Sequence, residues 1–188
     1  MRRTALLLLL LLSACAGKPT TYLALVPVPG VARPAFGLQA LAVSAIDIPP
    51  AIDRLHLTTG AAPGVLHVAG NIQWAGPLGP MARIVLAQDL AARLTRTDVL
   101  MPGDPLPPEG AASLQVTVQD FMPDAKGQVR LRADWTALAP DGQRVLAQGR
   151  FSQRFDSGQG AADEARCMSQ ALGCLLYTSP SPRDRTRS

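Results

Sequence analysis

The sequence predicts an α+β fold in which an antiparallel β-sheet of the meander type carries two main helices packed on one face. Three stretches late in the chain, 114–119, 129–137 and 145–152, alternate apolar with polar residues, as strands with one buried face do. Two other stretches, 81–94 and 161–173, repeat apolar residues at helical spacing. Strands grouped in one run, with helices outside that run, are typical of the α+β class.

The chain begins with the features of an exported protein. Arg2 and Arg3 precede an apolar run over 4–12, which is shorter than the roughly 20 residues that a helix needs to cross a bilayer. A positive start, a short apolar run and small residues after it define a secretory signal peptide, predicted here as residues 1–14. The order Leu12-Ser13-Ala14-Cys15 resembles a bacterial lipobox, which implies cleavage before the cysteine and acyl chains on it.

Cys15 is therefore the candidate lipid-attachment residue. The alternative is a plain secretory signal followed by an incidental cysteine. Two or more acyl chains hold a protein stably at a membrane, whereas one chain holds it only marginally. In lipoproteins of this type an Asp after the cysteine favours retention at the inner membrane, and Ala16 stands at that position. In a bacterium with two membranes, this favours the periplasmic face of the outer membrane.

Residues 15–37 are predicted to form a lipid-anchored, proline-rich tether, and 38–173 the folded domain. A flexible tether of this length reaches a few tens of ångströms at most. Residues 22–26 are apolar enough to add a short strand to the domain. The residues that punctuate the tether are Pro19, Pro27, Pro29, Gly30 and Pro34.

The first half of the domain contains short strands and one long helix. The helix over 81–94 runs without a helix-breaking residue. At 100° per residue, Asp89 and Arg93 lie on its polar side together with Gln88, and Val85 interrupts this side. The apolar side consists of Ile84, Leu86, Ala87, Leu90, Ala91 and Leu94. The expected strands cover 38–48, 54–58, 65–69 and 98–101, with a turn at 60–64 and a loop over 102–110.

The three alternating strands are joined by short turns. The segment 122–127 contains Pro123 and Asp124 and ends on Gly127, and Pro140 is followed by Asp141-Gly142. Such residues favour tight turns between antiparallel strands. One face of the resulting sheet is apolar and the other is polar, so that one side faces water.

The composition changes abruptly after Gly173. Residues 174–188, "CLLYTSPSPRDRTRS", resemble translated sequencing-adapter read-through, and such foreign segments are left out of fold predictions. The alternative is a basic, disordered tail. With Cys15 acylated and Cys174 foreign, Cys167 remains alone on the last helix, where it is expected to be a small buried apolar residue. No disulfide framework is predicted.

The net charge of +4 belongs to the two ends of the chain. From Cys15 to Gly173 the sequence contains 13 Lys and Arg and 13 Asp and Glu, so the body is neutral. A nucleic-acid-binding domain carries a basic face. The sequence therefore predicts no nucleic-acid partner.

The sequence contains no motif for a catalytic nucleophile, a metal site or a phosphate-binding loop. His56 and His67 lie in expected strands with apolar neighbours, so neither is predicted to bind metal or to act in catalysis. Trp74, just before the helix, is expected to pack in the core rather than line a cleft. Asp120, Asp124 and Asp134 are expected on the solvated face of the sheet. No catalytic residue, metal or cofactor is predicted.

The order of several weak motifs resembles the PqiC/YmbA-type ABC-transport auxiliary lipoproteins. In that family a lipobox is followed by an apolar segment, a "W-x-x-P-L" segment that leads into a helix ending "L-A-x-x-L", and a late strand with an Asp-Gly hairpin. The resemblance covers most of 15–173. The matching residues are Tyr22-x-x-Leu25, Trp74, Pro77, Leu78, Leu90-Ala91-x-x-Leu94, Val129 to Trp135 and Asp141-Gly142.

This resemblance implies a non-enzymatic accessory subunit of an ABC-type or MCE-type (mammalian cell entry) system that transports lipids between membranes and supports envelope integrity. The implied partners are an MCE-domain protein or another transporter subunit, and the membrane through the acyl chains of Cys15. One alternative is a lipoprotein of another envelope assembly machine. A second, from a different class, is a lipid-anchored envelope hydrolase.

Overall fold

The computed structural model describes residues 18–32, 37–158 and 160–175. The predicted signal peptide, Cys15 and residues 176–188 lie outside this part of the chain. The helices and strands of the described part follow the order that the sequence predicts. They are β1 (Thr21–Leu23), β2 (Ala40–Asp47), β3 (His56–Ala62), β4 (Val65–Trp74), α2 (Leu78–Arg93), β5 (Asp98–Leu100), β6 (Ala112–Pro123), β7 (Gln128–Leu138), β8 (Val145–Asp156) and α3 (Ala161–Cys174).

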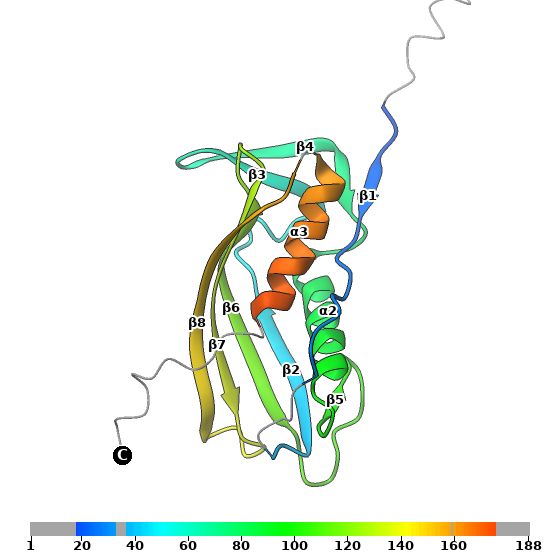
Figure 1. Cartoon of the computed structure of the whole chain (residues 1–188), viewed down its shortest axis with the longest axis vertical. Helices are drawn as coiled ribbons and strands as arrows, with labels where there is room; N and C mark the ends of the chain where they lie inside the picture. Colours follow the sequence, from blue (N-terminus) through cyan, green and yellow to red (C-terminus); the bar gives the residue numbers. More distant parts are fainter. Residues whose placement is uncertain (1–17, 33–36, 159, 176–188) are drawn as a thin grey trace, which may run out of the picture.

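The larger sheet has five strands in the order β5-β2-β6-β7-β8. β6, β7 and β8 are antiparallel neighbours, as the alternation predicts. β2, however, pairs in parallel with both β5 and β6. The α+β class is therefore confirmed, whereas the antiparallel meander holds only for the last three strands. The sheet curves along one side of the molecule, and both helices are seen beside it in Figure 1.

A second sheet of three strands, in the order β1-β4-β3, forms one end of the molecule (Figure 1). β3 and β4 form an antiparallel hairpin, and β1 pairs in parallel with the last residues of β4. The predicted turn at 60–64 is shorter in the structure, because β3 continues to Ala62. Gly64 in that turn has φ of +76°, a conformation that glycine adopts without strain.

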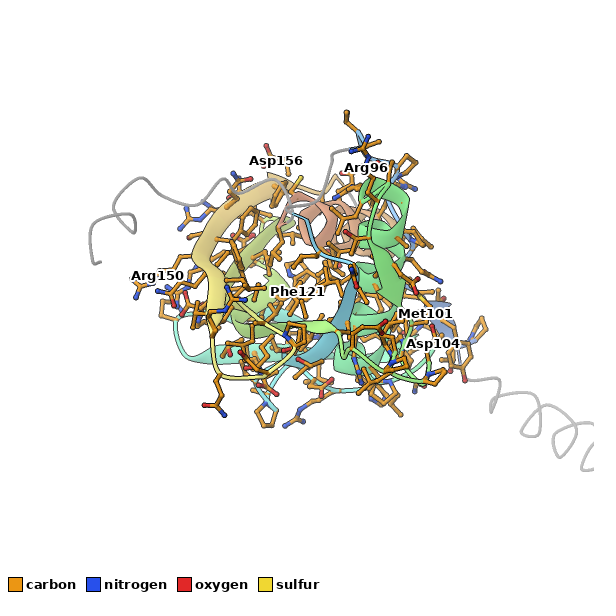
Figure 2. All side chains as sticks on the ribbon, turned by 90° about the horizontal axis from the view of Figure 1, so that it is seen from below. Arg96, Met101, Asp104, Phe121, Arg150 and Asp156 are labelled. Atoms are coloured by element: carbon orange, nitrogen blue, oxygen red, sulfur yellow. The ribbon has the colours of Figure 1, made fainter. Side chains whose placement is uncertain are left out.

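The two helices cover different strands of the larger sheet. α2 contacts β2 and β5, whereas α3 contacts β6, β7 and β8. The largest side chains that are fully enclosed include Phe121, Leu131 and Met168, from β6, β7 and α3. Figure 2, a view along the long axis, shows Phe121 in the middle of the molecule and Arg150 on its outer side. Trp74 and Cys167 are buried in the same core, which confirms both interpretations.

α2 begins three residues earlier than predicted, at Leu78. Pro80 lies in its first turn, where the missing N–H of a proline has no helical acceptor to lose. The N–H of Gly79, in the same turn, donates a 2.9 Å hydrogen bond to Oδ1 of Asp53. A carboxylate from a distant loop thus caps the helix, which local sequence does not reveal.

The predicted polar side of α2 is buried, and this prediction was wrong. Asp89, Arg93 and Val85 are all enclosed, whereas Ile84, assigned to the apolar side, is 45% exposed. Gln88 is exposed, as expected. The reason is that α2 is covered on two sides, by the sheet and by segments from both ends of the described chain. The prediction assumed that only one side of the helix is buried.

The close contact between Gly149 and Trp135 gives a first testable prediction. The two residues are partners on β8 and β7, and a Cβ at Gly149 would lie 2.9 Å from Cζ2 of Trp135. Gly149→Ala is expected to lower the free energy of unfolding by about 1–3 kcal/mol, because the ring must shift. Urea denaturation measures the change. Gly70→Ala is the matched control, since nothing lies within 4 Å of a Cβ there, and an equal loss in both variants would contradict the packing argument.

Candidate functional site: the strap that leads to the anchor

The segment from Leu25 to Gly30, here called the strap, joins the start of the described chain to both helices. Leu23 and Leu25 are part of the core. The N–H of Val26 donates to Oγ of Ser169 on α3 at 3.1 Å. The N–H of Val28 donates to Oδ1 of Asp89 on α2 at 2.7 Å. The strap therefore lies across α2 and α3 and is fixed to each of them.

Asp89 and Arg93 stand one turn apart on α2 and are 1% and 5% exposed. Nη2 of Arg93 donates to the carbonyl of Val28 at 3.1 Å, and Nη1 donates to the carbonyl of Gly173 at 2.6 Å. Burial raises the pKa of the Asp89 carboxyl, while the Val28 N–H and the Arg93 charge act in the opposite direction. The two charges thus connect three separate segments of the chain within the core.

Two glycines make room for this arrangement. A Cβ at Gly30 would collide with the guanidinium of Arg93. A Cβ at Gly173 would lie 3.2 Å from Nη2 of Arg93 and 3.4 Å from Oδ2 of Asp89. The charged groups therefore pack against bare backbone on the strap and on α3, which larger residues would not permit.

Ser169 offers a direct test of how firmly the strap is held. It is fully buried, and its hydroxyl also donates to the carbonyl of Ala165 at 2.9 Å. Ser169→Ala leaves the Val26 N–H without its acceptor, so the free energy of unfolding is expected to fall by about 1–2 kcal/mol. Hydrogen exchange at the Val26 amide should accelerate accordingly. The exposed neighbour Gln170, changed to Ala, is the control, and unchanged exchange at Val26 in the Ser169 variant would contradict this role.

The strap shortens the free chain between the candidate anchor and the domain. The expected tether extended from Cys15 to Gly37, but β1 already begins at Thr21. Thr21 lies six positions after Cys15, and a fully extended chain over six positions spans about 20 Å. If Cys15 is acylated, the domain must therefore lie next to the membrane.

The histidines and carboxylates singled out in the sequence do not form a common site. His56 is a partner of the Gln73 side chain at 3.0 Å, while His67 is exposed on β4. In the part of the chain that the structure describes, no group of three or more His, Cys, Asp or Glu could hold a metal ion.

The three aspartates lie along the β6–β7 hairpin and on its polar face. Asp134 is 3.4 Å from Nε of Arg150, and Asp120 is 3.4 Å from Nη1 of Arg130. Asp124 accepts hydrogen bonds from the N–H groups of Lys126 and Gln128, which lowers its pKa. Burial raises the pKa of Asp120, against the opposing charge of Arg130. Asp134, with 51% of its side chain exposed, lies on the solvated face as predicted, whereas the Asp120 side chain is only 15% exposed and the prediction was wrong for it.

A pocket of about 400 Å³ lies at the end opposite the three-stranded sheet. The loop between β5 and β6, the start of β2 and the turn between β7 and β8 form its walls. Figure 2 shows two of its residues, Met101 and Asp104, at this end. Arg83 also lines the pocket, but its Nε is engaged by the carbonyl of Val43 at 2.6 Å. The lining residues form no group with evident chemistry.

The buried pair on α2 is the feature that the sequence interpretation missed. Asp89 and Arg93 were assigned to solvent because they share a side with Gln88. The signal available was Val85, an apolar residue on the supposedly polar side. An i, i+4 Asp–Arg pair next to such a residue is compatible with a buried, hydrogen-bonded pair as well as with a solvated face.

Solved structures share this architecture. One, described only as an uncharacterized protein, has a TM-score of 0.70 and 19% sequence identity, covering 85% of this chain and 95% of that chain. Another, protein XCC0632 from Xanthomonas campestris with the family label DUF330, has a TM-score of 0.62 and 20% identity, covering 83% and 89%. At these identities the likeness concerns the fold. No curated protein matches the chain.

The fold thus places the chain in a class of α+β domains of which solved examples exist. The family model for the ABC-type transport auxiliary lipoprotein component matches residues 22–176. The chain belongs to this family, and the resemblance seen in the sequence motifs is confirmed. The matched range begins within β1, so it includes the predicted tether from residue 22 onward.

Proposed function

We propose that this protein is a non-enzymatic accessory lipoprotein of an MCE-type system that transports lipids between the two membranes of a bacterial envelope. The observation that carries the proposal is the family match over residues 22–176 directly after the Leu12-Ser13-Ala14-Cys15 motif. An auxiliary transport component has no need of catalytic groups, and none was predicted from the sequence.

Acyl chains on Cys15 hold the protein at the periplasmic face of the outer membrane in this proposal. The residue after the cysteine favours the outer membrane, because it is Ala16, whereas an Asp at this position would favour retention at the inner membrane. In the described part of the chain, no helix has the length and apolar character needed to cross a bilayer. Fatty chains attached to Cys15 would supply stable attachment without such a helix.

The outer edge of β8 is the surface that we propose for the transporter subunit. β8 is the last strand of the five-stranded sheet and is 12 residues long. A terminal strand offers backbone N–H and C=O groups to which a partner can add a strand. Arg150 and Arg154 are exposed on β8 and would favour an acidic or polar partner segment over self-association of the edge.

Crosslinking in cells tests both parts of the proposal. A photo-crosslinking amino acid is placed at Gln153 on β8, and at Arg132 on the neighbouring strand β7 as the matched control, since both are exposed. Adducts with an MCE-domain protein, a permease or an ATPase of an ABC transporter are expected from position 153 and not from 132. Adducts with components of another envelope assembly machine would replace this function with the alternative. Equal adducts from both positions would reject the β8 edge.

A further inference from the structure

The three-stranded sheet carries an unusual number of exposed apolar side chains. Among the described residues, five exposed large apolar or aromatic side chains lie on β1, on the β3–β4 hairpin or directly before it, with exposed fractions from 40% to 67%. Exposed apolar side chains gathered on one small sheet suggest a binding site for a protein or a membrane. We call this surface the apolar end: Tyr22, Leu55, Val65, Leu66 and Val68.

The β3–β4 hairpin itself carries no charged residue. Residues 55–82 contain no Asp, Glu, Lys or Arg, although the larger sheet carries charged pairs along its polar face. Moving a charge into a bilayer is costly, whereas an uncharged hairpin with exposed Val and Leu gains free energy there. Tyr22, the most exposed of the five, is of the type that collects at the boundary between lipid and water.

The two lysines of the chain are Lys18 and Lys126, and both lie beside this surface. Lys18 is exposed and lies three positions before β1 begins at Thr21. Lys126 is exposed in the β6–β7 turn, where Asp124 forms a bridge with Gly60 of β3. Lysines near a bilayer surface keep their ammonium groups among the headgroups and attract anionic lipids.

The anchor fixes which end of the molecule meets the membrane. The chain enters the domain at the end formed by β1, β3 and β4 (Figure 1). Lys18 lies three positions after Cys15, and a fully extended chain over three positions spans about 10 Å. An amphipathic surface at an interface lies about 5–10 Å deep in the headgroup region. The tether is thus too short to lift the apolar end far from the bilayer.

We propose that the apolar end lies on the membrane as a second, noncovalent contact, with Leu66 and Val68 of the hairpin among the acyl chains and Tyr22 at the headgroup level. This inference rests on the proposed acylation of Cys15. The domain then stands on the bilayer with a fixed orientation, and the pocket end with Met101 and Asp104 faces away from it.

A fluorescent probe reports the contact in the full-length acylated protein. The protein is reconstituted in vesicles of phosphatidylethanolamine and phosphatidylglycerol, some of which carry nitroxide quenchers on their acyl chains. An environment-sensitive probe is attached at Leu66→Cys, or at Leu106→Cys as the matched control, both in a Cys174→Ser background. Leu106 is an exposed leucine at the opposite end, and the buried Cys167 remains in place. The background protein without an added cysteine measures labelling at Cys167.

The probe at position 66 is expected to show blue-shifted emission and quenching several-fold stronger than at position 106. Solvent-like emission and equal quenching at both positions, on protein that floats with the vesicles, would overturn the membrane contact and leave the anchor intact. Blue-shifted emission at 66 without lipid quenching would assign the surface to a protein partner or a second copy instead. Protein that fails to float and has an unmodified Cys15 by mass spectrometry would refute the acylation itself.

Discussion

Asp89→Ala is expected to lower the free energy of unfolding by about 1.5–3 kcal/mol, because the Val28 N–H loses its buried, charged acceptor. The Arg93 guanidinium also loses a nearby opposite charge. Both losses affect the strap, so its amide hydrogens should exchange faster than those of β6 and β7. Urea denaturation of a Cys15→Ala chain, which avoids the acyl group, measures the change in stability.

Two variants serve as controls for this result. Gln88→Ala alters the adjacent exposed residue of α2 and should change stability by no more than about 0.5 kcal/mol. In the double variant Asp89→Leu/Arg93→Met, both buried charges are removed together, so its loss should be smaller than the sum of the single losses. A loss for Asp89→Ala as small as that for Gln88→Ala would mean that the carboxylate is not important for the core.

Cys15→Ala is expected to move the protein from the membrane fraction to the soluble or precursor fraction while the domain stays folded. The acyl chains contribute about 0.8 kcal/mol for each buried CH2, far more than the apolar end can contribute alone. The unfolding curve should be unchanged, because Cys15 precedes β1 by six residues. Cell fractionation and intact-mass measurement determine the outcome.

Cys174→Ala is the matched control, because this cysteine lies on α3 and should leave the distribution between fractions as it is. Mature Cys15→Ala protein that still sediments with membranes would show that something other than acyl chains holds it there. An unmodified thiol on the native N-terminus would contradict the anchor directly.

Helices and strands were predictable where the pattern that defines them lies within one short stretch of sequence. Alternation over β6, β7 and β8 is set by which face meets the core, so their existence and order followed from residues such as Val116, Leu131 and Phe151. The parallel pairing of β2 between β5 and β6 did not follow, because no local pattern states which distant strand is the neighbour. The three-stranded sheet could not be predicted for the same reason, since β1 pairs with a strand, β4, that lies about 50 residues later in the chain.

The candidate site was less predictable than the fold. The lipobox is a contiguous motif, so Cys15 could be proposed from sequence alone. The strap depends on Val28, Asp89 and Gly173, which meet only after both helices have packed. A helical projection assumes one buried side, and α2 has more than one, so Asp89 and Arg93 were placed in water. The apolar end was missed because Val65, Leu66 and Val68 were counted as ordinary strand residues.

The hydrogen bonds of the strap join residues that are made at very different times. Val26 meets Ser169 across 143 positions, and Val28 meets Asp89 across 61. Contacts between such distant positions slow the folding of a domain. The Val26 N–H cannot reach its acceptor before α3 has been synthesised, since Ser169 lies on that helix. The beginning of the domain is therefore secured by its end, and a growing chain holds the strap only once α3 has been made.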